Sequence, residues 1–188
     1  MKRFIFIARL CILTSSVILA AAVVRPQQPA QAPAAAVDPA DVSSVDAILH
    51  ATYDVISGEA GKKRDWQRFR SLFWPGARLI PTSSRPDGTT GARVLDVEGY
   101  ITQAGEYFEK NSFFEREVAR RTERFGHIAH VFSTYESRHR ADDPKPFARG
   151  INSFQLLYDG KRWWVVTIYW QAEGPKNPLP RKYLTSKP

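Results

Sequence analysis

The fold is decided by residues 149–173, which read RGINSFQLLYDGKRWWVVTIYWQAE. Two runs rich in β-branched and aromatic residues flank Asp159-Gly160, a dipeptide that favours the two positive φ angles of a two-residue type I′ turn. We therefore expect a hairpin in which Tyr158 opposes Lys161 and Asn152 opposes Thr167. Because successive side chains of a strand point to opposite faces, this register assigns each side chain of the hairpin to one sheet face.

Helical patterns precede the strands along the chain. A first apolar stripe runs from Val45 to Ile56, and Asp65 and Asp96 are candidate N-caps of a second and a third helix. The pattern then alternates, which predicts four strands, at residues 113–124, 128–140, 147–158 and 161–172. Helices followed by an antiparallel meander predict an α+β domain, with three N-terminal helices packed against a strongly curved, mainly antiparallel sheet.

This order of elements resembles the nuclear-transport-factor-2-like superfamily. The residues that carry the resemblance are the helix-to-strand crossing at 69–81, FRSLFWPGARLIP, and the end of the last hairpin at 164–171. The superfamily includes ketosteroid isomerase, scytalone dehydratase and many small exported bacterial proteins of unknown function. The resemblance implies a cone-shaped barrel with an internal apolar cavity, but one fold supports many functions, so it leaves the chemistry open.

The N-terminus has the pattern of a secretory signal peptide, which we predict at residues 1–22. It begins with three basic residues, continues into an apolar run at 10–24, and offers Ala20-Ala21-Ala22 as a cleavage site. The apolar run is shorter than the roughly 20 residues of a bilayer crossing, so no stable membrane span is expected after cleavage. We predict export to the periplasm or the exterior, with an uncleaved N-terminal membrane anchor as the alternative.

Three further segments are predicted after the signal. Residues 23–40 are rich in Pro, Ala and Gln, a composition typical of a semi-extended tether. The folded domain is predicted at 41–174. Residues 175–188 are predicted to form a Pro-rich basic tail.

Cysteine content and charge exclude several classes of function. The single cysteine, Cys11, lies inside the predicted signal, so the mature chain would have no disulfide, catalytic thiol or cysteine metal site. The net charge of +8 includes three basic residues of the signal, and the remaining excess is mild, which argues against nucleic-acid binding. His127 and His130 are three apart on a predicted strand and so point to opposite faces, and neither a metal site nor a cofactor is predicted.

One face of the predicted hairpin is assigned to the cavity, because its second strand is apolar and its polar groups are small and uncharged. Its members are Ile151, Ser153, Gln155, Leu157, Trp164, Val166, Ile168 and Trp170. The opposite face carries several large side chains, among them Phe154, Leu156, Trp163 and Tyr169. A patch of that size is expected to be covered, and we predict a homodimer through the outer sheet face.

A comparison with the isomerase argues against its reaction in this chain. Tyr53 on the first helix looks like the tyrosine donor of that enzyme, but residues 78–82, where the resemblance would place its catalytic aspartate, contain no acid. Ser153 and Gln155 stand on the assigned inner face where a buried acid would be needed. The charged run at 115–124 is interpreted as a solvated strand edge.

Two classes of function follow from these observations. We predict an exported, non-catalytic domain that binds a small apolar or amphipathic molecule in its cavity or mediates assembly. The predicted ligand-binding residues are Tyr53, Ser153, Gln155, Trp164, Ile168 and Trp170. The alternative is a dehydratase-, cyclase- or hydrolase-type enzyme, in which His130 acts as acid or base with Tyr53 or Asp54 from the first helix.

Overall fold

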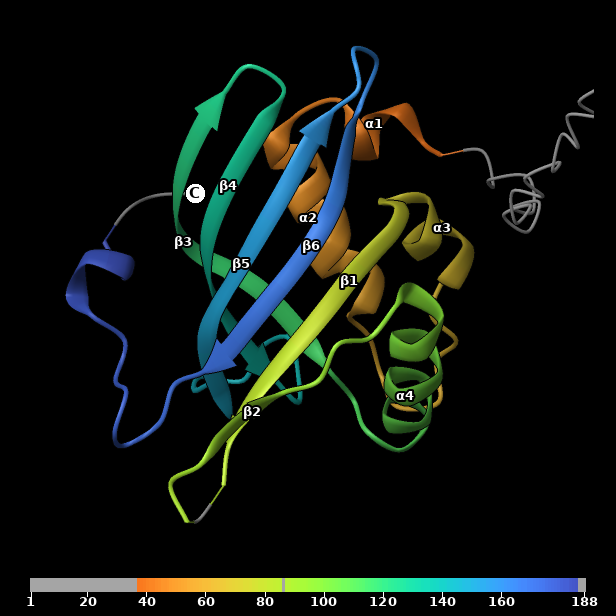
Figure 1. Cartoon of the computed structure of the whole chain (residues 1–188). Coiled ribbons are helices and arrows are strands. Elements are labelled where there is room, and N and C mark those ends of the chain that lie inside the picture. The colour runs from red at the N-terminus through yellow and green to blue at the C-terminus, as the bar shows by residue number, and fades with distance from the viewer. Residues whose placement is uncertain (1–36, 86, 186–188) are drawn as a thin grey trace, which may run out of the picture. The chain divides into compact units, whose positions relative to one another are not determined.

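A six-stranded sheet with the last hairpin near its centre organises the protein. The computed structural model describes residues 37–85 and 87–185. The strands lie in the order β2-β1-β6-β5-β4-β3, and β1 with β6 forms the one parallel pair among the described strands (Figure 1). Their bounds are β1 Phe73–Ser84, β2 Thr90–Ala92, β3 Phe114–Phe125, β4 Ile128–Arg138, β5 Ala148–Tyr158 and β6 Trp163–Ala172. The sheet is open, since β2 and β3 each have a single neighbouring strand.

Three of the described α-helices begin where the sequence predicts them, and α1 was not predicted. The bounds of the helices are α1 Pro39–Val42, α2 Val45–Ile56, α3 Trp66–Ser71 and α4 Val97–Lys110. Figure 1 shows α2 crossing behind the sheet and α4 standing beside β1. The side chains of Ser44, Asp65 and Asp96 each accept a hydrogen bond from the backbone N–H three residues later, at 3.0, 2.8 and 2.7 Å. The α+β class is confirmed, and no helix among the described residues has the length and hydropathy to cross a membrane.

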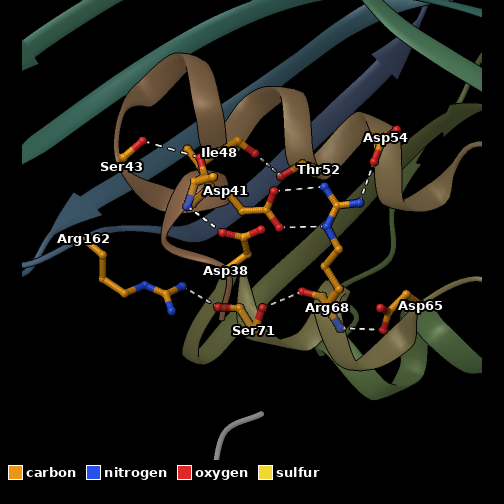
Figure 2. Close-up of polar contacts among 11 residues, drawn as sticks. Asp38, Asp41, Ser43, Ile48, Thr52, Asp54, Asp65, Arg68, Ser71 and Arg162 are labelled. Carbon is orange, nitrogen blue, oxygen red and sulfur yellow. Dashed lines mark hydrogen bonds and ion pairs between the residues drawn. The ribbon is translucent and has the colours of Figure 1, made fainter. Parts of the chain in front are cut away.

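The predicted tether ends earlier than expected. Asp38 accepts a hydrogen bond from the Ala40 N–H and caps α1, a helix that the sequence assigned in part to the tether. Arg68 of α3 then holds this helix, with two guanidinium nitrogens 2.7 and 2.9 Å from the Asp41 carboxylate and a third 2.5 Å from Asp54 of α2 (Figure 2). One guanidinium therefore joins three helices. The predicted signal and the tether up to residue 36 lie outside the described residues.

The turn of the last hairpin differs from the prediction. Tyr158 pairs with Trp163, so the loop has four residues rather than two. Among the described residues positive φ is confined to glycines, and Gly160 has it while Asp159 does not. The Asp159 carboxylate instead accepts hydrogen bonds from the backbone N–H groups of Lys161 and Arg162, at 2.8 and 2.9 Å. A side-chain acceptor thus closes a wider loop than the type I′ turn.

The predicted face assignment of the hairpin is reversed, except where a β-bulge in β6 restores it for Ile168 and Trp170. Leu156 pairs with Val165 and Gln155 with Thr167, which leaves Val166 as an extra residue in β6. In β5 the side chains that face the helices are Asn152, Phe154 and Leu156. In β6 they are Trp163 and Val165 before the bulge and Ile168 and Trp170 beyond it. The inward assignment is therefore wrong for Ser153, Gln155 and Trp164.

The prediction of an aromatic patch on the outer face is wrong, because the face assigned outward is the one that packs against the helices. Phe154, Leu156 and Trp163 are buried in the core, and of the four named residues only Tyr169 is exposed. The predicted tail covers another part of the outer face, because the Tyr183 ring packs 5.4 Å from that of Phe132. The homodimer stays a prediction, without the surface that first indicated it.

Gly150 permits the close approach of three strands. It pairs with Tyr135 of β4, and a Cβ at this glycine would lie 2.6 Å from the Tyr135 hydroxyl and 2.3 Å from the Gln171 carbonyl oxygen of β6. The second contact is with backbone, which cannot turn aside as a side chain can. The tyrosine therefore crosses the strand at the one residue without a side chain.

We predict that Gly150→Ala lowers the free energy of unfolding by about 3 kcal/mol, because the added methyl group overpacks this crossing. Chemical denaturation followed by circular dichroism measures the change. Gly91→Ala is the matched control, since the nearest atom to its Cβ would be an Arg85 nitrogen at 3.9 Å. Equal stability of the two variants would contradict the prediction.

Candidate functional site

A cavity of about 410 Å³ lies between the inner sheet face and the helices α2 and α4. Its walls are mostly apolar and rich in aromatic rings. The aromatic lining consists of Tyr53, Phe69, Tyr100, Tyr107, Phe108, Phe113, Tyr135, Phe147, Phe154 and Trp170. Arg93 and Gln103 line it as well, and the Arg93 guanidinium donates a hydrogen bond to the Gln103 side-chain oxygen. A volume of this size suits a small organic molecule.

The polar end of the cavity is built around the carboxylate of Glu115. This residue lies near the start of β3, and its Oε2 accepts a hydrogen bond from the Ser137 hydroxyl of β4 at 2.8 Å. Its Oε1 accepts a second hydrogen bond from the Asn152 amide of β5 at 3.3 Å. Three adjacent strands therefore position one acid and two neutral donors at a single point of the lining.

The apolar surroundings change the acidity of this carboxyl. Burial raises the pKa of Glu115 from its ordinary value of 4.5 to about 7, and the hydrogen bonds from Ser137 and Asn152 offset only part of that rise. Burial and the nearby charge of Glu115 also raise the pKa values of Tyr100 and Tyr135, so both phenols stay neutral. The site therefore has one group that exchanges its proton near neutral pH.

Tyr53 is committed to a chain of hydrogen bonds that leads away from the cavity. The Ser133 hydroxyl donates to Glu117 at 2.5 Å, so the Tyr53 hydroxyl, 2.7 Å from Ser133, supplies the proton in that contact. The Asn152 amide donates to the Tyr53 oxygen at 3.1 Å. Glu117 is held in turn by the Arg120 guanidinium at 2.9 Å. Tyr53 thus positions Asn152, and its proton points away from Glu115.

The predicted acid or base His130 is not part of this cluster. Its ring lies on the outer sheet face, with Nε2 3.1 Å from the Ser153 hydroxyl. Asp54 lies on the helix side and is paired with Arg68 (Figure 2). The structure therefore does not bring His130 together with Tyr53 or Asp54.

The predicted ligand-binding residues divide into two groups. Tyr53, Ile168 and Trp170 line the cavity. Ser153, Gln155 and Trp164 do not, because the helices cover the other face of the hairpin, the one with Phe154, Leu156 and Trp163. Ser153 bonds His130, and the indole of Trp164 donates to the Asp159 carboxylate at 2.7 Å.

Sequence reasoning missed Glu115 because it lies in a run of charges that reads as a solvated edge. A signal was present on the neighbouring strand, where Ser133, Tyr135 and Ser137 alternate with other residues and so share a face. Ala129 and Val131 share this face and are apolar, which indicates that the face is buried. Hydroxyl groups on a buried face need hydrogen-bond partners. Such partners are supplied by Glu115 and Glu117 across the β3–β4 ladder.

A second hollow of about 540 Å³ lies between α2 and β3 and shares Tyr53 and Glu115 with the cavity. Its remaining lining is largely charged and includes Asp46, Arg120 and Arg138. Within residues 37–85 and 87–185, no group of three or more His, Cys, Asp or Glu side chains is placed to hold a metal ion.

Comparison with known proteins identifies the fold but no activity. No protein-family model and no curated protein sequence matches the chain. A structure from Nostoc punctiforme, of a protein of unknown function with a cystatin-like fold, is 11% identical over 72% of this chain and 92% of that chain, with a TM-score of 0.53. A structure from Kribbella flavida is 8% identical over 70% of this chain and 90% of that chain, with a TM-score of 0.52.

An NTF-2 like protein of unknown function from Silicibacter pomeroyi is 13% identical over 70% of this chain and 94% of that chain, with a TM-score of 0.48. The protein is thus an α+β domain whose open sheet and helices enclose a cavity. Its fold is similar to that of the Nostoc punctiforme and Kribbella flavida proteins, and membership of the nuclear-transport-factor-2-like superfamily stays a prediction. At these identities the likeness concerns the fold alone.

The raised pKa of Glu115 predicts a specific dependence of stability on pH. Between pH 4.5 and about 7 the unfolded chain has this carboxyl ionised while the folded chain keeps it protonated, so its contribution to stability is present below pH 4.5 and is lost as the pH rises. We expect Glu115→Gln to gain up to about 3 kcal/mol relative to the wild type between pH 4.5 and 8.

Urea denaturation of both proteins at several pH values measures this difference. Glu123→Gln, at an exposed position of the same strand, is the control and should follow the wild type. A difference between Glu115→Gln and the wild type that does not change with pH would show that Glu115 titrates like an ordinary glutamate.

Proposed function

We propose that this protein binds a small, largely apolar molecule in the cavity, with one polar group of that molecule at Glu115. The observation that carries the proposal is the combination of a cavity of about 410 Å³, an aromatic lining and one polar cluster at its end. Binding sites for small molecules have this composition, with many apolar contacts and a few fixed polar groups that set orientation.

The polar cluster is fixed before any ligand arrives, which favours binding. Ser137 and Asn152 hold both oxygens of Glu115, and Tyr53 with Ser133 holds the Asn152 amide. Little side-chain freedom would be lost on binding, and affinity gains from such preorganisation.

Acid–base catalysis by Glu115 is the second candidate function. The observation that favours it is the pKa of about 7, the range in which a carboxyl can both accept and donate a proton at neutral pH. The catalytic alternative based on His130 has no such support, because His130 lies on the opposite sheet face. Turnover of a bound molecule that is lost in Glu115→Gln while binding persists would favour this candidate.

We also propose that the domain acts after export, on the strength of the N-terminal pattern at residues 1–22. Expression of the full chain in a bacterial host should yield a shortened protein in the periplasm or medium, identified by N-terminal sequencing. An intact N-terminus in the membrane fraction would instead support the anchored alternative.

Filling the cavity tests the binding proposal directly. Ala104 of α4 lines the cavity, so Ala104→Phe should weaken binding of the neutral probe N-phenyl-1-naphthylamine at least tenfold, or about 1.4 kcal/mol. Thr102→Phe places the same ring on the exposed side of α4 and should leave affinity unchanged. Probe fluorescence measures both, with circular dichroism as a check of folding. Unchanged affinity in folded Ala104→Phe would place the binding elsewhere.

A further inference from the structure

Glu115 is the one acidic side chain that lines the cavity among the described residues, and its hydrogen-bond partners are neutral. Both Ser137 and Asn152 donate to it without carrying charge. Once ionised, the carboxylate therefore has a negative charge at the polar end of a largely apolar cavity, and no cation among the described residues forms an ion pair with it. Such a charge is costly unless a positive group approaches.

The nearby guanidinium groups are paired with other acids, although Arg120 Nε and Arg138 Nη1 have no hydrogen-bond partner. Arg120 is paired with Glu117 at 2.9 Å and with Asp46 at 2.5 Å. Arg116 and Arg138 are both paired with Glu136. Arg93 lies on the cavity lining but is exposed and bonded to Gln103. The structure thus leaves the charge of Glu115 to be balanced from within the cavity.

The walls around the carboxylate suit a cation as well. Tyr100 and Tyr135 lie close enough for the charge of Glu115 to raise their pKa values, and both rings face the cavity. The faces of aromatic rings attract ammonium groups, and the attraction grows when water is excluded. A carboxylate surrounded by rings therefore provides both parts of a site for an organic ammonium ion.

Building on the proposed function, we infer that the ligand is an apolar amine whose ammonium group binds at Glu115 and whose carbon body fills the aromatic cavity. A neutral alcohol of the same shape would contact the apolar walls in the same way, but it would bring no positive charge to the ionised carboxylate. A carboxylate of the same shape would bring a second negative charge to the site.

Affinity for such an amine should increase with pH through the neutral range. An aliphatic ammonium group resembles that of lysine, with a pKa of about 10.4, and stays charged through the neutral range. Only the Glu115 carboxyl must lose a proton for binding, so affinity should rise about tenfold between pH 6 and pH 8. The other titratable or charged groups that face this region are Asp46, His50, Tyr53 and Asp54 from α2, Tyr100 and Tyr107 from α4, Arg116, Glu117 and Arg120 from β3, Tyr135 and Arg138 from β4, and Arg93.

Isothermal titration calorimetry of the full chain with three matched probes tests the inference. The probes are 4-phenylbutylamine, 4-phenylbutan-1-ol and 4-phenylbutanoate, which share one carbon body and differ in charge. At pH 8 we expect the amine to bind at least tenfold more tightly than the other two. The preference and the pH dependence should disappear in Glu115→Gln and persist in Glu123→Gln.

Proton release gives a second readout that needs no variant. At pH 7 about half of the Glu115 carboxyl is protonated, so each bound amine should release about half a proton, measured by titrating in buffers of different ionisation enthalpy. Equal binding of amine and alcohol without proton release would overturn the cation inference and leave the proposed function intact. Failure of all three probes to bind would count against both.

Discussion

One extra residue in β6 decides which side chains face the helices. Before the bulge, Trp163 and Val165 point inward and fill the core at one end of the sheet. Without Val166 as an extra residue, strand alternation would turn Ile168 and Trp170 outward. With it, both return to the inner face and line the cavity. Core and cavity thus share one face of one strand, and β6 contributes Ile168 and Trp170 to the cavity because the alternation is interrupted at a single point.

The polar cluster shows how a buried charge can set the direction of a whole chain of hydrogen bonds. Glu117 accepts the proton of Ser133, which makes Ser133 an acceptor for Tyr53 and Tyr53 an acceptor for Asn152. The amide then has a second proton for Glu115. Removing any member would leave a partner without its bond, and unpaired polar groups are expensive inside a protein. The carboxylate of Glu115 is therefore held by a network whose charge is balanced at its far end, beside Arg120.

Local features of the chain could be predicted from the sequence, and pairings across the sheet could not. Helix caps such as Asp65 and Asp96 depend on contacts three residues away, so their positions followed from the pattern. The face of Ser153 depended on which side of the hairpin the helices cover, and both sides have large apolar side chains. The inward position of Ile168 depended on a bulge that composition does not reveal. The role of Glu115 depended on partners 22 and 37 residues away. Whether a charged residue of such a run is exposed or lines a site depends on the residues of the neighbouring strand.

The C-terminal segment around Tyr183 packs against the outer face of the sheet. Thr134 on the outer face is fully buried, and its hydroxyl donates to the Tyr183 carbonyl oxygen at 2.6 Å. A chain cut before the short helix Arg181–Tyr183 would expose the ring of Phe132 together with a threonine that has lost its acceptor. Exposed apolar surface of this kind promotes association between copies. The oligomeric state of a shortened protein would therefore be a poor guide to that of the native one.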